Sequence, residues 1–278
     1  MTVSHVESMS EGTGLTTSRG RGRLLLAEVA KTYVSRTGNY EALQETSLII
    51  EPGEVVTVVG PSGCGKSTLL KIIAGLIPFS GEILIDEEPI SGPHYDIGFM
   101  FQSAVLFPWR TVLDNVLLPA RLRRDKDPAT DERARKLLHL VGLDKVASAL
   151  PKELSGGMQQ RAALCRVLLN DPHILLLDEP FASLDEFTRE RLNLELMSIQ
   201  EATGKTVVFV THNVIEAVFL SDRVAVMSKG PGRVKGIVPI DLPRPRTTSV
   251  MRTPAFTDYV FEVRELLGLD LDERSDQS

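Results

Sequence analysis

A glycine-rich stretch between Gly60 and Thr68 carries the clearest chemistry in the sequence. It reads Gly-Pro-Ser-Gly-Cys-Gly-Lys-Ser-Thr, which has the spacing of a phosphate-binding P-loop. The glycines let backbone N–H groups curl around phosphate oxygens at positions where side chains would collide. A helix that follows the glycines adds the positive end of its dipole. The predicted nucleotide-binding residues are Gly60, Pro61, Ser62, Gly63, Cys64, Gly65, Lys66, Ser67 and Thr68.

Two side chains of this stretch have separate tasks. The Lys66 ammonium is expected to reach the β- and γ-phosphates, and the Ser67 hydroxyl to ligate Mg²⁺. The apolar run Val55 to Val59 before the loop predicts a buried parallel strand, and Leu69 to Ala74 after it predicts a helix. A chance glycine-rich turn is the alternative, and the flanking strand and helix argue against it.

A pair of acidic residues ends another apolar run. Ile174 to Leu177 predicts a buried strand, and Asp178 and Glu179 follow it directly. A carboxylate at the C-terminal end of a parallel strand is where Mg²⁺ requires a ligand, which favours Asp178. Glu179 is then placed to polarise a water molecule. Two acids in series are costly in a strand unless metal or water binds them, so a packing role is disfavoured.

A second anion site is predicted at Leu154 to Arg161. Gly156 and Gly157 precede a helix expected over Met158 to Leu169, and Ser155 is expected to cap it. A helix N-terminus with small residues around it suits a bound anion.

Three single residues carry weaker signals. Gln102 ends a short strand expected over 98–101 and could reach a metal-bound water, or be solvated in a loop. His212 follows a strand expected over 206–210 and could sense the γ-phosphate or be structural. Tyr33, late in the first strand, is either a stacking platform for adenine or a half-buried strand aromatic.

Composition limits the class of protein. The chain has 278 residues, 42% hydrophobic and 24% charged, which supports a sizeable core in one domain or slightly more. A net charge of −6 gives no global electrostatic case for binding nucleic acid. Cys64 and Cys165 suit neither a disulfide framework nor a metal site, so we expect a reducing compartment. The N-terminus is polar and no apolar run is long enough to span a bilayer, so a cytosolic protein is expected.

The order of patterns along the chain predicts its organisation. Residues 1–22 are rich in Ser, Thr, Gly and Glu and predict a disordered tail. From about residue 103 to about 170 strand patterns stop, which predicts a helical insertion. Within it, Phe107 and Trp109 are either a small satellite core or a surface for a partner. Residues 244–278 predict a tail with a short helix. Other expected elements are strands Leu24–Val34, Ala42–Ile50 and Glu82–Asp86, a turn at Thr37–Asn39, and helices Ala129–Val141, Glu186–Ala202 and Phe256–Leu267.

The set of motifs resembles the ATPase subunits of ABC transporters over about residues 24–240. It comprises the P-loop, Gln102, the Leu-Ser-Gly-Gly-Met-Gln-Gln run from Leu154, the Asp178–Glu179 strand end, Ser183-Leu184-Asp185 and His212. The resemblance implies an α/β fold: a P-loop NTPase (RecA-like) core, an antiparallel β subdomain and an inserted helical subdomain, together spanning 23–243. Its implied cofactors are ATP and Mg²⁺.

The resemblance also implies roles. Metal ligation falls to Ser67, Asp178 and Gln102, and catalysis to Glu179 as base with Lys66, Gln102 and His212. Tyr33 matches the aromatic that stacks on adenine. Ser155 and Gly157 of one copy are implied to close over ATP held by Lys66 of a second copy. The further cofactor-binding residues are Gly156, Gln159 and Asp185.

A narrower similarity is to the importer branch for nitrate, sulfonate and taurine. It rests on Gly60-Pro61-Ser62-Gly63-Cys64-Gly65, Leu106-Phe107-Pro108-Trp109-Arg110-Thr111-Val112, Asp114-Asn115-Val116, Gly157-Met158, Glu179-Pro180-Phe181, Thr188-Arg189 and Pro231-Gly232-Arg233. This implies a homodimer, or a pair with another ATPase subunit, at the periphery of the cytoplasmic face of the inner membrane. The pair would bind integral membrane permease subunits and be served indirectly by a solute-binding protein. The alternatives are a soluble ABC-type ATPase outside transport and a P-loop metabolite kinase.

Overall fold

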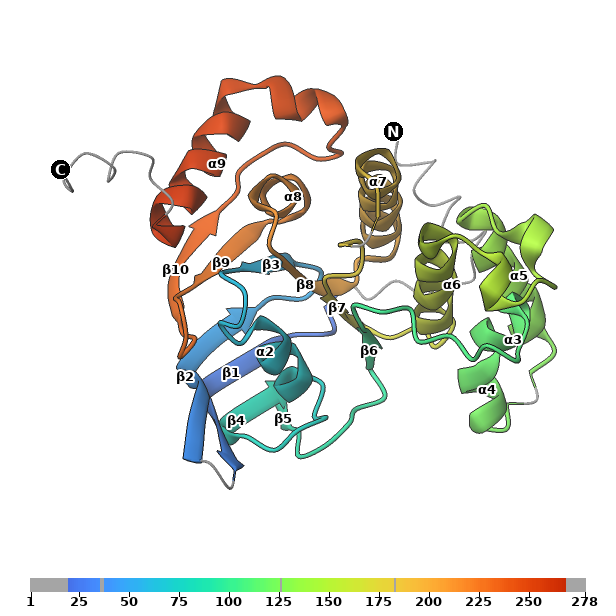
Figure 1. The fold of residues 1–278 in the computed structure, drawn as a ribbon, viewed down its shortest axis with the longest axis horizontal. Coiled ribbons are helices and arrows are strands. Elements are labelled where there is room, and N and C mark those ends of the chain that lie inside the picture. Colours follow the sequence, from blue (N-terminus) through green and yellow to red (C-terminus); the bar gives the residue numbers. More distant parts are fainter. Residues whose placement is uncertain (1–19, 36–37, 126, 183, 269–278) are drawn as a thin grey trace. The chain divides into compact units, whose positions relative to one another are not determined.

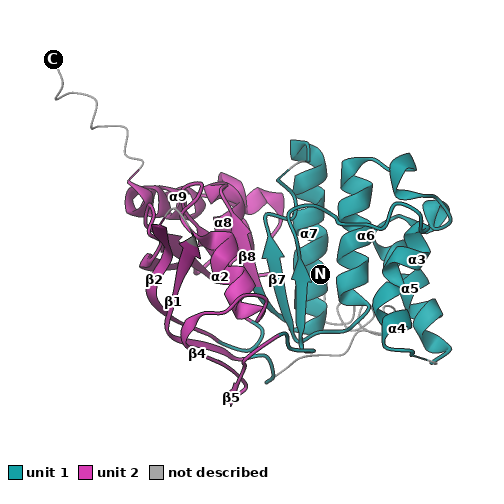
Figure 2. Ribbon diagram, turned by 60° about the horizontal axis from the view of Figure 1, so that its bottom comes forward, with its two compact units in different colours: residues 1–22, 51–53, 93–207 teal, residues 23–50, 54–92, 208–278 magenta. Residues whose placement is uncertain are grey.

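The computed structural model describes residues 20–35, 38–125, 127–182 and 184–268. It divides the chain into two compact units, shown in different colours in Figure 2. Unit 1 comprises 1–22, 51–53 and 93–207, and unit 2 comprises 23–50, 54–92 and 208–278. Most of the predicted N-terminal tail and Ser183 lie outside the described residues.

Unit 2 contains an antiparallel four-stranded sheet in the order β2-β1-β4-β5, which confirms the predicted antiparallel β subdomain (Figure 1). Its strands are β1 (Leu24–Ser35), β2 (Gly38–Ile50), β4 (Ser80–Ile85) and β5 (Glu88–Pro89). The turn predicted at Thr37–Asn39 was placed too late, because Gly38 and Asn39 already pair with Ser35 and Val34. The glycine therefore starts a strand here, and the predicted start of that strand at Ala42 was wrong.

The P-loop strand of unit 2 is β3 (Val55–Val59), as predicted, and all its residues are buried. It pairs in parallel with β9 (Arg223–Met227), which pairs antiparallel with β10 (Val234–Pro239). An apolar strand buried on both faces is what parallel pairing requires. The helices of this unit are α2 (Lys66–Ile73), α8 (Val214–Leu220) and α9 (Pro254–Leu267).

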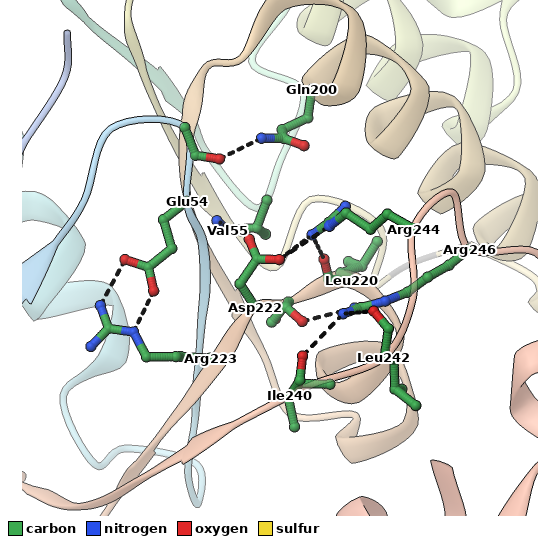
Figure 3. Close-up of polar contacts among 12 residues, drawn as sticks. Glu54, Val55, Gln200, Leu220, Asp222, Arg223, Ile240, Leu242, Arg244 and Arg246 are labelled. Carbon is green, nitrogen blue, oxygen red and sulfur yellow. Dashed lines mark hydrogen bonds and ion pairs between the residues drawn. The ribbon is translucent and has the colours of Figure 1, made fainter. Parts of the chain in front are cut away.

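Partly buried polar contacts tie the later strands and the following segment into unit 2 (Figure 3). Arg223 forms a two-pronged ion pair with Glu54, just before β3. The Asp222 carboxylate accepts a hydrogen bond from the backbone N–H of Val55 at 2.8 Å and pairs with Arg244 at 2.9 Å. These contacts fix the start of the P-loop strand against the chain that follows β9.

Arg246 completes this network. Its side chain is only 4% exposed and donates to five backbone carbonyl oxygens. Three of them end helix α8 and two follow β10, as partly drawn in Figure 3. A cation at a helix C-terminus is favoured by the dipole and satisfies carbonyls that no helical N–H reaches.

Unit 1 contains the parallel strand pair β6 (Ile97–Met100) and β7 (Ile174–Asp178). Between them in sequence, the described residues of 103–170 hold helices and no strand, as predicted. The α-helices of the unit are α3 (Val112–Val116), α4 (Leu118–Leu122), α5 (Ala129–Leu140), α6 (Gly156–Leu168) and α7 (Glu186–Thr203), with short 3-10 turns at Asp144–Val146 and Pro151–Glu153.

The predicted amphipathic face of α5 is confirmed, because Ala134, Leu137, Leu138 and Val141 are all buried. Two helices begin earlier than predicted. Helix α6 begins at Gly156, and helix α2 begins at Lys66. Gly156 and Gly157 therefore lie in the first turn of α6, and Lys66 is the first residue of α2. No helix in the described part of the chain is long and apolar enough to span a membrane.

Candidate functional site

The P-loop of unit 2 ends in a left-handed residue that starts helix α2. Gly65 is the N-cap with φ +100°, and Gly63 has φ +76°. Both conformations are strained for residues with a side chain. No side chain caps α2 and its first turn holds no acidic residue, so the positive end of the helix dipole at this start suits an anion.

The outside of the loop is braced by backbone from two other segments. A Cβ on Gly65 would lie 2.6 Å from the Ala42 carbonyl oxygen in β2. A Cβ on Gly232 would lie 1.8 Å from the Cys64 carbonyl oxygen. The backbone N–H of Gln44 donates to Gly232 at 2.8 Å, which joins β2 to the turn before β10. These close approaches need glycine and fix the shape of the loop.

Lys66 is almost fully buried within the loop, with 5% of its surface exposed. Its Nζ donates to the carbonyl oxygens of Gly60 at 2.8 Å and Pro61 at 3.1 Å. These bonds satisfy a buried ammonium group and keep it beside the helix start. A phosphate bound there would face both the ammonium group and the backbone N–H groups of the helix start.

The Cys64 thiol in the same loop is 1% exposed. Burial raises its pKa above the usual value, against an opposing effect of the nearby Lys66 charge. A protonated, buried thiol is a poor nucleophile. Cys64 therefore contributes packing and backbone to the loop.

In unit 1 the acidic pair lies at the end of β7. Asp178 is the last residue of the strand and is 5% exposed. Glu179 has φ +44°, a left-handed conformation that is uncommon outside glycine and often marks functional sites. The Nε2 of Gln102 lies 3.5 Å from Oε2 of Glu179. Two residues predicted separately from the sequence are thus side by side.

The loop after Gln102 is held by helix α6. Nε2 of the buried Gln160 donates to the Gln102 carbonyl oxygen at 2.7 Å. Arg166 donates to the carbonyl oxygens of Val105 at 2.8 Å and Ala104 at 3.0 Å. Sequence reasoning missed both anchors. Gln160 lies inside a recognised motif, but nothing in its pattern indicates which way its side chain points.

The second predicted anion site lies at the start of α6. The Ser155 hydroxyl accepts a hydrogen bond from the Met158 N–H at 3.3 Å, which confirms the predicted cap. Gly156 has open space where a Cβ would lie, whereas a Cβ on Gly157 would lie 3.1 Å from the Thr188 methyl group. Gln159 turns back and donates to the Pro151 carbonyl oxygen at 3.0 Å. The helix start therefore keeps a bare surface at Gly156.

Asp185 caps α7 by accepting a hydrogen bond from the Thr188 N–H at 2.9 Å. This bond lowers the pKa of the Asp185 carboxyl below its usual value, so the group is charged at neutral pH. The cap faces the same Thr188 whose methyl group approaches Gly157. Thr188 therefore lies next to both the Asp185 cap of α7 and Gly157 at the start of α6.

Two predicted nucleotide contacts lie in unit 2. Tyr33 is 39% exposed on β1, with Lys31 Nζ 5.1 Å from the centre of its ring. His212 is exposed at the end of β8 (Thr206–Thr211). Its neighbours are fixed, because Thr211 donates to Glu216 and Asn213 caps α8.

The predicted site residues divide between the units. The P-loop, Tyr33 and His212 belong to unit 2, and Gln102, Asp178, Glu179, Asp185 and the glycine motif of α6 to unit 1. No group of three His, Cys, Asp or Glu side chains in the described parts of the chain could hold a metal ion alone. The Ser67 hydroxyl and the Asp178 carboxylate are nevertheless hard oxygen donors of the kind Mg²⁺ prefers, and Mg²⁺ usually completes its shell with phosphates and water.

An aromatic pair lies on the surface of unit 1. Trp109 is 72% exposed and Phe107 37%, with their rings edge to face at 5.4 Å. The fully buried Asn115 accepts from the Phe107 N–H at 2.7 Å and donates to carbonyl oxygens of Phe107, Arg110 and Thr111. The satellite-core interpretation is wrong for Trp109, since the ring faces solvent on a firmly held loop.

A P-loop between a buried strand and a helix, an acidic strand end, and a serine-capped helix that begins with two glycines together define a nucleoside triphosphate hydrolase. The family described as ABC transporter matches residues 43–182. The chain belongs to the ABC transporter family, as one of its ATP-binding, ATP-hydrolysing members.

Relatives agree over most of the chain. An uncharacterized ABC transporter ATP-binding protein of Methanocaldococcus jannaschii is 48% identical over 250 residues, 90% of this chain and 92% of the relative. The aliphatic sulfonates import ATP-binding protein SsuB of Bacillus cereus is 47% identical over 221 residues, 79% of this chain and 87% of that protein.

Solved structures confirm the fold. The ATP-binding cassette MJ0796, in a dimeric post-hydrolysis state bound to ADP and Pi, superposes with a TM-score of 0.70 at 36% identity. The match covers 79% of this chain and 100% of the cassette. The predicted α/β cassette fold is therefore confirmed.

Proposed function

We propose that this protein is the ATPase subunit of an importer that takes up a small solute of the nitrate, sulfonate or taurine kind. The observation that carries the proposal is one loop with two features. Gln102 at its start contacts Glu179, and the exposed Trp109 lies seven positions further along the chain. The short segment from Gln102 to Trp109 therefore joins the contact with the Glu179 carboxylate to an exposed aromatic surface suited to a partner. Helix α6 holds this segment through hydrogen bonds. The 47% identity to an aliphatic sulfonates importer subunit supports the solute class.

In the proposed chemistry, Glu179 accepts a proton from the attacking water and Gln102 orients that carboxylate. Lys66 and the P-loop N–H groups stabilise the phosphates, and His212 contacts the γ-phosphate. Tyr33 stacks on adenine. Mg²⁺, held by Ser67, Asp178 and Gln102, would neutralise phosphate charge when bound.

The active form is proposed to be a two-fold dimer. In it the residues Ser155, Gly156, Gly157, Gln159 and Asp185 of one copy close over ATP held by Lys66 of the other. The dimeric state of the MJ0796 cassette supports this arrangement. A dimer with two-fold symmetry has two equivalent sites, each built from residues of both copies. The ATP-driven cycle of closing and reopening would then move the permease subunits.

The partners are proposed to be integral membrane permease subunits, with a solute-binding protein reached through them, at the cytoplasmic face of the inner membrane. The ATPase domain is proposed to span 23–243, with the helical subdomain at about 103–170 and a tail from 244. The test is affinity purification of the tagged chain from detergent-solubilised membranes. Recovery with integral membrane subunits, and uptake of a sulfonate or taurine that needs this chain, is expected. A chain that hydrolyses ATP but stays in the soluble fraction without membrane partners would instead be a soluble ABC-type ATPase.

A further inference from the structure

Tyr40 lies against the P-loop, although neither its position nor its type belongs to any motif above. Its hydroxyl group is 3.5 Å from the Gly63 carbonyl oxygen. A Cβ built on Gly230 would lie 3.8 Å from the same hydroxyl oxygen. The hydroxyl end of the ring is therefore placed between the phosphate-binding turn and the turn before β10, all within unit 2.

The other end of Tyr40 lies beside Tyr33. The two tyrosines are direct partners in the β1–β2 ladder, and the neighbouring pair Val34–Asn39 continues the same register. Partners in an antiparallel pair project to the same face of the sheet, with Cβ atoms about 5 Å apart. Strands β1 and β2 run side by side in Figure 1. Tyr40 thus spans the gap between the Tyr33 platform and the P-loop.

A nucleotide that uses both ends must pass Tyr40. Its phosphates would lie at the start of α2 near Lys66, and its base at Tyr33. Tyr40 is 56% exposed, although its hydroxyl group lies beside the loop, so part of its side chain is open to a ligand. The strand pairing places Tyr40 and Tyr33 on the same face of the sheet.

We propose that Tyr40 is a second nucleoside-contacting residue, which packs its ring along the ribose and base edge of a bound purine nucleotide. The hydroxyl group lies beside Gly63, so the ring lies next to the phosphate-binding turn, and the strand pairing of Tyr40 holds the ring there. This inference rests on the proposed nucleotide site and adds a residue to it. A sugar and base edge that pack against an aromatic face gain dispersion energy and exclude water from the contact. Phosphates are bound by N–H groups and cations instead. The contribution of Tyr40 is therefore specific to the nucleoside part of the ligand.

The experiment compares binding of Mg-ADP and of Mg-pyrophosphate to the full chain by titration calorimetry, since neither is consumed by hydrolysis. Tyr40→Ala should weaken ADP binding about tenfold, the size of one good aromatic contact, and leave pyrophosphate binding within about twofold. Tyr40→Phe keeps the ring and should bind ADP nearly as well as the wild type. Tyr95→Ala removes a tyrosine that is 75% exposed in unit 1 and serves as the matched control, with both affinities unchanged.

Two outcomes would overturn the inference. Unchanged ADP binding by Tyr40→Ala would show that the ring does not touch the nucleoside. Equal losses of ADP and pyrophosphate binding would make Tyr40 a support for the P-loop alone. Pyrophosphate binding by the variant also reports that the loop is folded. If the wild-type chain binds neither ligand, the proposed nucleotide site itself fails, which is a separate result.

Discussion

Gln102 and Glu179 are 77 positions apart in the sequence, and their side chains lie 3.5 Å apart. The amide nitrogen of Gln102 is placed to donate to the carboxylate, and Gln160 holds the Gln102 backbone from helix α6. A carboxylate that accepts a proton must be oriented toward the water it activates. In the proposed mechanism, this contact makes Gln102 a positioning residue for Glu179.

The first prediction follows from this contact. Gln102→Ala should lower the rate of ATP hydrolysis about tenfold while ATP affinity changes less than about threefold, because orientation is lost and the phosphate contacts remain. Gln102→Glu should be worse, since a second carboxylate beside Glu179 favours protonation of one of the pair. Phosphate release and equilibrium nucleotide binding measure the two effects. An Ala variant with normal turnover would remove Gln102 from the proposed mechanism.

The second prediction concerns the shared site. If each site is shared between two copies, as proposed, Lys66→Ala and Ser155→Arg each break both sites of a homodimer. A mixed dimer contains one chain of each variant. One of its two sites then has both substitutions, and the other has wild-type Lys66 and wild-type Ser155. Nucleotide should therefore be occluded at one site per mixed dimer. Occlusion is the readout, because hydrolysis can require both sites together. Heterodimers verified by two different tags that occlude no nucleotide would show that sites are not shared.

The third prediction concerns the exposed aromatic pair. Trp109→Ala should weaken assembly with the membrane subunits or uncouple transport, because buried aromatic anchors carry about 2 kcal/mol or more at interfaces. Hydrolysis by the isolated subunit and its melting temperature should change little, since the ring is 72% exposed. Leu122→Ala is the control, because that side chain is 75% exposed elsewhere in the helical segment. Equal loss of isolated ATPase activity and transport would assign Trp109 to the catalytic core.

The fourth prediction concerns the buried arginine of unit 2. Arg246→Ala leaves the carbonyl oxygens at the end of α8 and after β10 without their donor, which should cost at least about 2 kcal/mol of unfolding free energy. Arg252→Ala is the matched control in the same segment, because its side chain is exposed and the change should be small. Urea unfolding measures both. Equal stability of the two variants would mean that water replaces the guanidinium at no cost.

The sequence predicted the elements whose period is regular. The β-branched strand β3 and the apolar face predicted for the helix from Ala129 to Val141 were recognised from their patterns alone, and both are buried as expected. Positions that depend on distant partners were not predictable. Gly38 starts a strand because Ser35 pairs with it, and propensity favoured a turn there. Helix α6 includes two glycines because the Ser155 cap fixes its start.

The candidate site shows the same division. Motif spacing identified Gln102 and Glu179 as separate residues, and their contact depends on how β6 and β7 pair. Nothing local marked Gln160 as the anchor of Gln102, or Tyr40 as a neighbour of the P-loop. Side-chain direction across long sequence separations is decided by packing, which no local pattern reports.

The most direct test of the account is to measure ATP turnover and nucleotide retention by Glu179→Gln. The matched control is Glu132→Gln, because Glu132 is an exposed residue of α5. If Glu179 accepts the proton of the attacking water, the variant should bind Mg-ATP as the wild type does, and its rate of phosphate release should fall about 10²–10⁴-fold. It should also accumulate as an ATP-bound dimer on size-exclusion chromatography. Near-normal phosphate release by Glu179→Gln would contradict the account.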